Sequence, residues 1–346
     1  MNNKEVTIYD IADKLAISAA TVSRALQDHP AVNKKTKQRI NELAIELGYR
    51  SNKFASNLRT KRTNTLGLIV PRLNSLFMSS VISGIEKVAN GAGYNLIISQ
   101  SFEQELKEKT NAITMFNNRV DALIVSLAAD TSDYAHFESF MKKNIPIVFF
   151  DRVPEQIDTT KVLIDNFAAG YKATQHLIEQ GYRLIVHITG NRMRNVYRER
   201  FEGYRQALAD AHLPFDEDMV ISNDLSEQAI QEAIEHNLLK REKLPDALFI
   251  SNDSSAAFAL SILKGKGLRI PEDMAIVGFN NDLISKVTEP PITTIHYPGI
   301  EMGESIARIL IDYLNGQGDL SFTSKIFLET ELVVRGSSVK DISALT

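Results

Sequence analysis

The sequence contains a near repeat that leaves few folds open. Residues 121–126 read Asp-Ala-Leu-Ile-Val-Ser, and residues 246–251 read Asp-Ala-Leu-Phe-Ile-Ser. A second pair follows 25 and 29 residues later, where 146–151 read Pro-Ile-Val-Phe-Phe-Asp and 275–280 read Ala-Ile-Val-Gly-Phe-Asn. Because both segments recur in the same order and at similar spacing, the sequence predicts two α/β lobes built on one plan.

Apolar runs alternate with amphipathic segments throughout the chain after residue 62. The runs have the length of strands and span 65–70, 95–99, 122–127, 147–150, 184–188, 247–250 and 275–279. Continuous apolar runs separated by helices predict parallel sheets that are covered on both faces.

Polar residues close several of these runs, namely Ser126, Asp151, Arg152, Asn252, Asp253, Asn280 and Asn281. Ligands of open α/β sheets bind beyond the carboxyl ends of the strands. Two such edges that face each other would form a cleft suited to a polyol or sugar. Asp and Asn also favour turns after strands, but their equivalent positions in both lobes favour a binding site.

The charge of the chain is divided unevenly. Residues 1–62 hold 12 Lys and Arg against 6 Asp and Glu, a net charge of +6. The other 284 residues hold 27 against 37, a net charge of −10. A basic segment on an acidic body suggests a polyanion such as nucleic acid as its partner. Chance clustering of charge on a solvated surface is the alternative.

Three short helices are predicted in the basic segment. They span 8–15, 19–26 and 34–47, and their capping residues are Thr7 (with Asp10 at the capping-box position), Ser18 and Asn33. Two helices of about two turns with a tight connection, followed by a third that closes the core, follow the helix-turn-helix plan.

The second helix is the expected recognition helix. Its exposed residues are Ala19, Ala20, Thr21, Ser23 and Arg24. The small side chains let the backbone approach base edges, and an arginine reaches guanine O6 and N7. We expect further DNA contacts, mainly to phosphate, from Thr7, Tyr9, Ser18 and Asn33, near Lys34, Lys35 and Lys37. A three-helix bundle without a ligand is the alternative.

A basic segment at 49–63 follows the three helices. Asn52 is expected to cap one helical stretch, 53–58, which is too short to be stable alone in water. Leu58, followed by Arg59 and other basic residues, suits an apolar wedge between base steps of the minor groove. The alternative is a basic linker whose leucine packs on the body.

Four stretches of the first 58 residues resemble the headpiece and hinge of the lactose/galactose repressor (LacI/GalR) family. They are Val6-Thr7-Ile8-Tyr9-Asp10-Ile11-Ala12, Ser18-Ala19-Ala20-Thr21-Val22-Ser23-Arg24-Ala25-Leu26, Val32 to Thr36, and Gly48-Tyr49-Arg50-Ser51-Asn52 with Ala55 and Leu58. The resemblance implies a homodimer on double-stranded palindromic operator DNA. It places the paired hinge helices (about 52–58) in the minor groove, with contacts from Asn52, Ala55, Leu58 and Arg59. Ser51 stands where the family has a proline.

The resemblance continues through the body and extends to periplasmic sugar-binding proteins. Matching stretches include Phe149-Phe150-Asp151-Arg152, Arg200-Phe201-Glu202-Gly203-Tyr204, Ser251-Asn252-Asp253 and Gly278-Phe279-Asn280-Asn281. The implied effector contacts are Asp151, Arg200, Asn252 and Asn280, joined by Arg72 and Leu225. Leu225 occupies a position where an aromatic side chain often stacks on the sugar, and Asn280 one where the family commonly has Asp. Five further arginines near the cleft hint at a sugar acid or sugar phosphate, with ordinary surface arginines as the alternative; they are Arg72, Arg152, Arg192, Arg194 and Arg198.

The implied fold is α/β, with an all-α helix-turn-helix headpiece and a two-lobed body like that of a periplasmic binding protein. The headpiece and hinge occupy 1–62, the effector-binding and dimerisation domain 63–340, and a tail 341–346. The first lobe is expected at about 63–164 and 296–325, and the second at about 165–293 and 326–340. An apolar stripe of Phe77, Met78, Val81 and Ile85 either forms the dimer interface or packs on its own sheet.

Several classes of function are disfavoured. The chain has no cysteine, which excludes disulfides, Cys-ligated zinc and thiol catalysis. It has no nucleotide-binding or hydrolase motif, and its seven histidines lack metal-ligand spacing. No apolar run reaches the roughly 18–20 residues of a spanning helix, and the first residues are polar. We therefore expect a cytoplasmic, ligand-controlled repressor that is not an enzyme and has no cofactor or metal. The rivals are a sugar receptor without a DNA role and a sugar-processing enzyme that uses a carboxylate pair.

Overall fold

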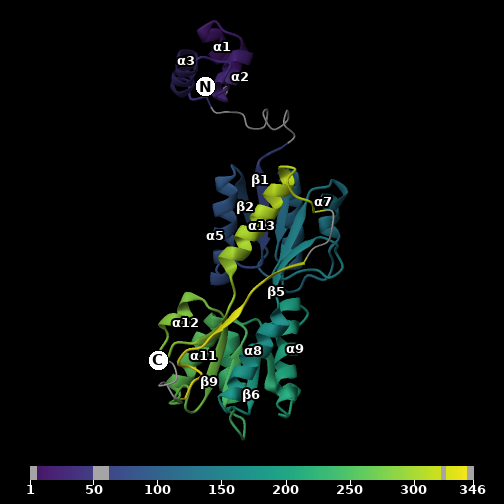
Figure 1. The fold of residues 1–346 in the computed structure, drawn as a ribbon, viewed down its shortest axis with the longest axis vertical. Helices are drawn as coiled ribbons and strands as arrows, with labels where there is room; N and C mark the ends of the chain where they lie inside the picture. Colours follow the sequence, from purple (N-terminus) through teal and green to yellow (C-terminus); the bar gives the residue numbers. More distant parts are fainter. Residues whose placement is uncertain (1–5, 50–61, 321–324, 341–346) are drawn as a thin grey trace. The chain divides into compact units, whose positions relative to one another are not determined.

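The computed structural model describes residues 6–49, 62–320 and 325–340. Backbone contacts divide the chain into two compact units, residues 1–63 and 64–346. The elements of each unit are drawn in Figure 1. The four expected hinge contacts, Asn52, Ala55, Leu58 and Arg59, lie outside the described residues.

The first unit is the predicted helix-turn-helix bundle. Its helices are α1 (Ile8–Leu15), α2 (Ala19–Leu26) and α3 (Lys34–Glu46). The Thr7 amide donates to the Asp10 carboxylate at 2.7 Å, and the Ser18 hydroxyl accepts from the Thr21 amide at 3.1 Å. Asn33 caps α3 in the same way. These caps explain why the chain starts a helix at each predicted position.

The second unit contains two six-stranded sheets. The first has the order β11-β5-β4-β3-β1-β2, from β1 (Thr65–Val70), β2 (Asn95–Gln100), β3 (Ala122–Val125), β4 (Ile147–Phe150), β5 (Thr160–Ile164) and β11 (Lys325–Leu328). The second has the order β12-β10-β9-β8-β6-β7, from β6 (Ile185–Thr189), β7 (Val220–Ser222), β8 (Ala247–Ile250), β9 (Ala275–Asn280), β10 (Thr293–His296) and β12 (Glu331–Val333). Nine of the ten described strand pairs are parallel; β10 and β12 are antiparallel. The prediction of parallel sheets in two lobes is confirmed.

Helices cover both sheets. In the first lobe they are α5 (Leu76–Gly91), α6 (Glu105–Asn117), η1 (Ala135–Phe137), α7 (Glu138–Lys142) and α13 (Gly299–Leu314). In the second lobe they are α8 (Asn166–Glu179), α9 (Asn195–Asp210), η2 (Glu217–Met219), α10 (Glu227–Glu232), η3 (Ala233–Leu238), α11 (Asp253–Gly265) and α12 (Leu283–Val287). The chain crosses between the sheets after β5, after β10 and after β11. The first sheet therefore extends through Leu328, three residues beyond the expected crossing at 325.

The apolar stripe of α5 packs inside its own lobe. Phe77, Met78, Val81 and Ile85 are buried in one core with residues of α13, and Figure 1 shows the two helices side by side. Of the two alternatives for this stripe, packing within the lobe is the correct one, so these side chains are not available as a dimer interface.

Two glycines bring α8 and α9 into direct backbone contact. A Cβ atom at Gly170 would collide with the backbone of Arg200, and a Cβ atom at Gly203 would collide with the carbonyl oxygen of Phe167. The two helix backbones can therefore approach this closely only because neither residue has a Cβ atom. Because α9 carries Arg200, this contact also fixes where that side chain begins.

Candidate functional site

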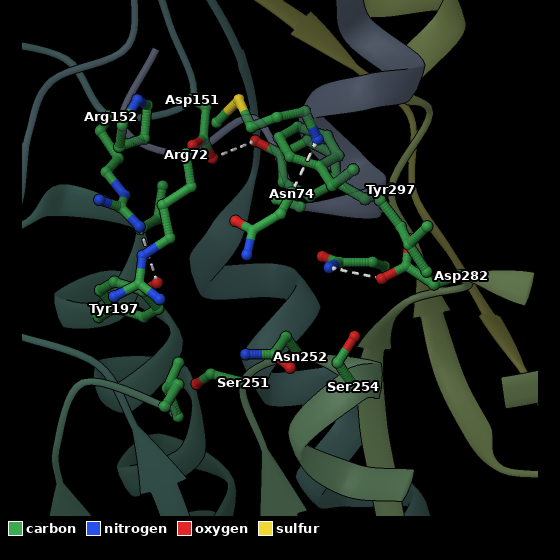
Figure 2. A pocket seen from close by; sticks show the side chains of 18 of the residues that line it. Arg72, Asn74, Asp151, Arg152, Tyr197, Ser251, Asn252, Ser254, Asp282 and Tyr297 are labelled. Carbon is green, nitrogen blue, oxygen red and sulfur yellow. Dashed lines mark hydrogen bonds between the residues drawn. The ribbon is translucent and has the colours of Figure 1, made fainter. Parts of the chain in front are cut away.

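A cavity of about 200 Å³ lies between the carboxyl ends of the two sheets. Figure 2 shows polar side chains from both lobes around it. All six residues predicted to contact an effector line this cavity: Arg72, Asp151, Arg200, Leu225, Asn252 and Asn280. The two predicted strand edges therefore meet at one site, beyond the carboxyl ends of the strands, where ligands of open α/β sheets bind.

Asp151 is the buried acceptor of the first lobe. It follows β4 with a φ of 56°, and 5 % of its surface is exposed. The Tyr297 hydroxyl donates to Oδ1 at 3.0 Å, and the Ser126 hydroxyl donates to Oδ2 at 3.3 Å. Burial raises the pKa of Asp151, while Arg152 and Arg200 act in the opposite direction. The left-handed backbone aims this carboxyl at the cavity, a form of strain often stored at binding sites.

Arg200 is the buried donor of the second lobe. Its Nε donates to Asn166 Oδ1 at 2.9 Å, and its Nη1 donates to the Ser251 carbonyl at 3.0 Å. The guanidinium carbon lies 3.6 Å from the centre of the Phe279 ring. Two partners and one ring thus fix the planar group, and Nη2 has no hydrogen-bond partner among the described residues. A fixed fork with a free donor suits a hydroxyl or carboxylate oxygen.

Asn252 and Asn280 line the second-lobe side of the cavity. Asn252 caps α11, because its Oδ1 accepts from the Ser255 amide at 2.7 Å; its Nδ2 is left to donate to a ligand. Asn280 has a φ of 113°, and its Nδ2 donates to Asp282 Oδ2 at 3.2 Å. Burial raises the pKa of Asp282 to about 6. This side therefore offers both donors and acceptors.

Three aromatic residues of the site were missed by the sequence reasoning. Phe77, Tyr197 and Tyr297 line the cavity, and the rings of Phe77 and Tyr297 stack with centroids 4.1 Å apart. They lie near the starts of α5 and α9 and in the connection before α13, so no strand-end pattern marks them. Leu225, where the family often has an aromatic, lines the cavity with a φ of 59°.

Three of the five arginines that hinted at an acidic ligand lie outside the cavity lining. Arg194 donates to the Thr131 carbonyl at 2.6 Å and is buried. Arg198 pairs with Glu155, and Arg192 lies 3.3 Å from the carboxylate of Glu217. These arginines already have protein partners, and only Arg72 and Arg152 border the cavity.

The expected DNA-contact residues of the first unit lie at the surface. Thr7, Tyr9, Ser18 and Asn33 are exposed, as are Ala20 and Arg24 of α2, while Ala19, Thr21 and Ser23 are partly buried. Val22 and Ala25 point into the core instead. Of the α2 face that the sequence assigns to bases, Ala20 and Arg24 are therefore exposed within this unit, whereas Ala19 packs partly against its core.

Comparisons with known proteins identify the family. A model of the bacterial regulatory proteins of the lacI family matches residues 7–52, and one of a periplasmic binding protein-like domain matches residues 174–338. Catabolite control protein A of Priestia megaterium is 31 % identical over 311 residues, which are 90 % of this chain and 93 % of that protein. The chain belongs to the LacI family. This LacI-family protein is thus a DNA-binding transcriptional regulator with a ligand-binding domain.

Further relatives extend over nearly the whole regulator. The transcriptional repressor CytR of Escherichia coli strain K12 is 32 % identical over 333 residues, 96 % of each chain. The solved complex of the regulator CelR with cellobiose has a TM-score of 0.72 at 28 % identity and covers 96 % of this chain and all of its own. The lac repressor dimer bound to operator has a TM-score of 0.82 at 23 % identity, which shows the shared fold.

The described residues contain neither a membrane-spanning helix nor a metal cluster. None of the helices there has the length and apolar character needed to cross a membrane. No three His, Asp or Glu side chains of the described segments are grouped so that they could hold a metal ion.

Proposed function

We propose that this regulator is a repressor whose operator binding is controlled by a sugar-like polyol in the cavity between the lobes. The main support is that two buried charged groups reach the cavity from opposite lobes. They are the carboxylate of Asp151 and the guanidinium of Arg200, which has a free donor. Asn252 and Asn280 add a donor and an acceptor. Polyols need such paired donors and acceptors. Solved relatives named as complexes with cellobiose and with D-xylulofuranose support this choice.

The DNA side of the proposal rests on α2. A recognition helix with small residues at its start and Arg24 near its end fits a major groove. Two copies on a palindromic operator require a homodimer with twofold symmetry; the similarity to the lac repressor, solved as a dimer bound to operator, supports this arrangement. We assign Leu58 and its neighbours to the minor groove on the sequence alone.

Ligand and DNA are coupled through the angle between the lobes. A ligand that bridges Asp151 and Arg200 favours one angle. The effector must therefore bind the DNA-bound and free forms with different affinities. We propose that the chain binds its ligand without turning it over, and that it acts in the cytoplasm, where its operator lies.

A two-part experiment tests the proposal. Palindromic DNA is selected from a random pool with the purified full chain, and its affinity is measured by fluorescence anisotropy with and without each of a panel of sugars. We expect nanomolar operator binding and at least one sugar that changes it tenfold or more. Arg24→Ala is the matched control and should lose operator binding while keeping the ligand-induced thermal shift. Chemical turnover of a bound sugar, or no selected DNA, would refute the proposal.

A further inference from the structure

One carboxylate, Glu103, lies between Arg72 and Arg152, two of the three arginines that line the cavity. Its Oε1 accepts from Arg72 Nε at 3.2 Å, and its Oε2 accepts from Arg152 Nη1 at 2.6 Å. The same Oε2 accepts from the Ala129 amide at 3.0 Å. Glu103 follows β2, Arg72 follows β1, Arg152 follows β4 and Ala129 follows β3. One side chain thus ties together four neighbouring strand ends on the first-lobe side of the cavity.

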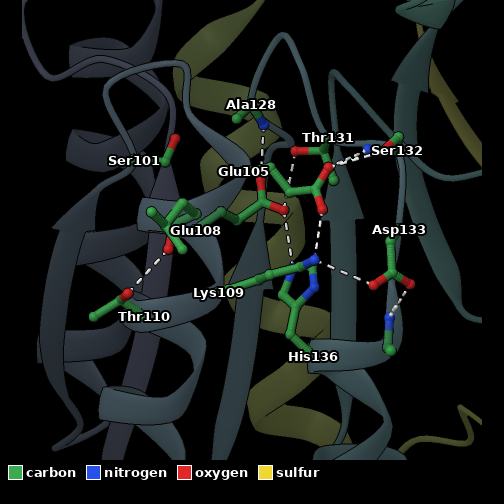
Figure 3. Close-up of polar contacts among 12 residues, drawn as sticks. Ser101, Glu105, Glu108, Lys109, Thr110, Ala128, Thr131, Ser132, Asp133 and His136 are labelled. Atoms are coloured by element: carbon green, nitrogen blue, oxygen red, sulfur yellow. Dashed lines mark hydrogen bonds and ion pairs between the residues drawn. The ribbon is translucent and has the colours of Figure 1, made fainter.

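Glu103 is held firmly in this position. Its φ is 63°, its side chain is 16 % exposed, and both of its oxygens are occupied. The loop that presents Ala129 is itself fixed from α6 (Figure 3). Glu108 accepts from the Ala128 amide at 2.7 Å, and Glu105 accepts from the Ser132 amide at 2.8 Å. The carboxylate is therefore fixed behind the wall, where it pairs with two arginines of the lining.

The other charges of the cavity are balanced as well. Arg200 lies opposite Asp151, and each acts on the pKa of the other. The pKa of Asp224 in the second lobe is lowered mainly by the hydrogen bonds of Asp224 with Ser226, and the nearby charge of Arg72 lowers it further. An anionic ligand would therefore find no cation without a carboxylate partner in the wall.

We propose that Glu103 determines specificity by charge: it neutralises Arg72 and Arg152, so that the cavity accepts neutral polyols and rejects sugar acids and sugar phosphates. Without this carboxylate, the two arginines, which follow β1 and β4 on either side of β3, would form a site for a carboxylate or phosphate, because the guanidinium fork pairs with such oxyanions. This inference rests on the proposed function and narrows its ligand class.

The test uses inorganic phosphate as the probe and the full chain as the protein. Phosphate affinity is measured by isothermal titration and thermal shift at constant ionic strength for the native chain and for Glu103→Gln. The glutamine keeps an oxygen for the Ala129 amide, so the wall should fold. We expect no saturable phosphate binding by the native chain and an affinity tighter by about tenfold or more in the variant. Adding Arg72→Gln to this variant should remove the gain.

Glu304→Gln is the matched control, because Glu304 has a similarly buried side chain in the same lobe but pairs with Lys87 and Arg308 outside the cavity lining. It should not gain phosphate affinity. Saturable phosphate binding by the native chain would overturn the proposal, as would a Glu103→Gln variant that binds no better. Should no neutral sugar bind the native chain while the phosphate results hold, the polyol assignment would fail and the charge role of Glu103 would stand.

Discussion

Replacing Arg200 with alanine separates ligand sensing from DNA binding. The free Nη2 of Arg200 is the donor that we assign to the ligand. A charge-assisted hydrogen bond contributes about 1.5–3 kcal/mol. At about 1.4 kcal/mol per factor of ten, Arg200→Ala should weaken ligand binding by about 10- to 150-fold. Operator affinity without ligand should change by less than about threefold, because the α2 surface is untouched.

The same substitution should also lower stability. It removes the donors to Asn166 and Ser251, at 2.9 and 3.0 Å, and leaves Asp151 with only one of its two nearby cations, Arg152. Leaving a buried polar group without its hydrogen-bond partner costs about 1–3 kcal/mol. Thermal melts should therefore show a lower Tm, and binding is to be measured well below it.

The assay is isothermal titration with the best sugar of the panel, alongside anisotropy with operator DNA. Arg205→Ala is the matched control, because Arg205 lies on the same helix, is exposed and does not line the cavity. It should leave both affinities unchanged. Unaltered sugar affinity in Arg200→Ala, or an equal loss of operator and sugar binding, would refute the assignment.

Three further predictions concern packing, pH and the hinge. Gly170→Ala should lower the free energy of unfolding by about 1–3 kcal/mol, because the new methyl group meets the Arg200 backbone. Gly91→Ala is the control and should not lower it, because a methyl group there has open space around it. Equal denaturant midpoints for the two variants would contradict the prediction. Burial raises the pKa of Asp253 to about 7, so the folded state holds this proton more tightly than the unfolded chain. Stability should therefore fall as pH rises from about 4 to about 7, by at most about 1.4 kcal/mol per unit, and Asp253→Asn should flatten this part of the Tm–pH curve; an unchanged slope would count against it. Leu58→Ala should weaken operator binding far more than sugar binding, and equal losses in the two titrations would rule out the hinge role.

The fold was predictable where burial alone determines an element. β1, β4 and β8 have the predicted bounds, because strands buried on both faces must be continuously apolar. β5 begins Thr-Lys and β7 has three residues, so neither shows that pattern. Pairing with strands that lie elsewhere in the sequence makes both of them strands.

The candidate site was predictable from strand ends but not from helix starts. Asp151 and Asn280 follow predicted strands, and both line the cavity. Tyr197 and Tyr297 reach it from a helix and a connection whose positions depend on tertiary packing. Glu103 was missed for a different reason: its importance lies in two arginines that are 31 and 49 residues away in sequence.

The glycine contact between α8 and α9 has a consequence for how ligand preference can change. α8 begins directly after the first crossing between the sheets, and α9, locked to it at Gly170 and Gly203, carries Arg200. Arg200 also donates to Asn166, the first residue of α8, so a ligand held by Arg200 would act directly on the segment where the chain crosses between the sheets. Leu225 lines the cavity but belongs to neither α8 nor α9. Substitutions at such lining positions can therefore change which ligand is bound while the packing of α8 against α9 stays the same.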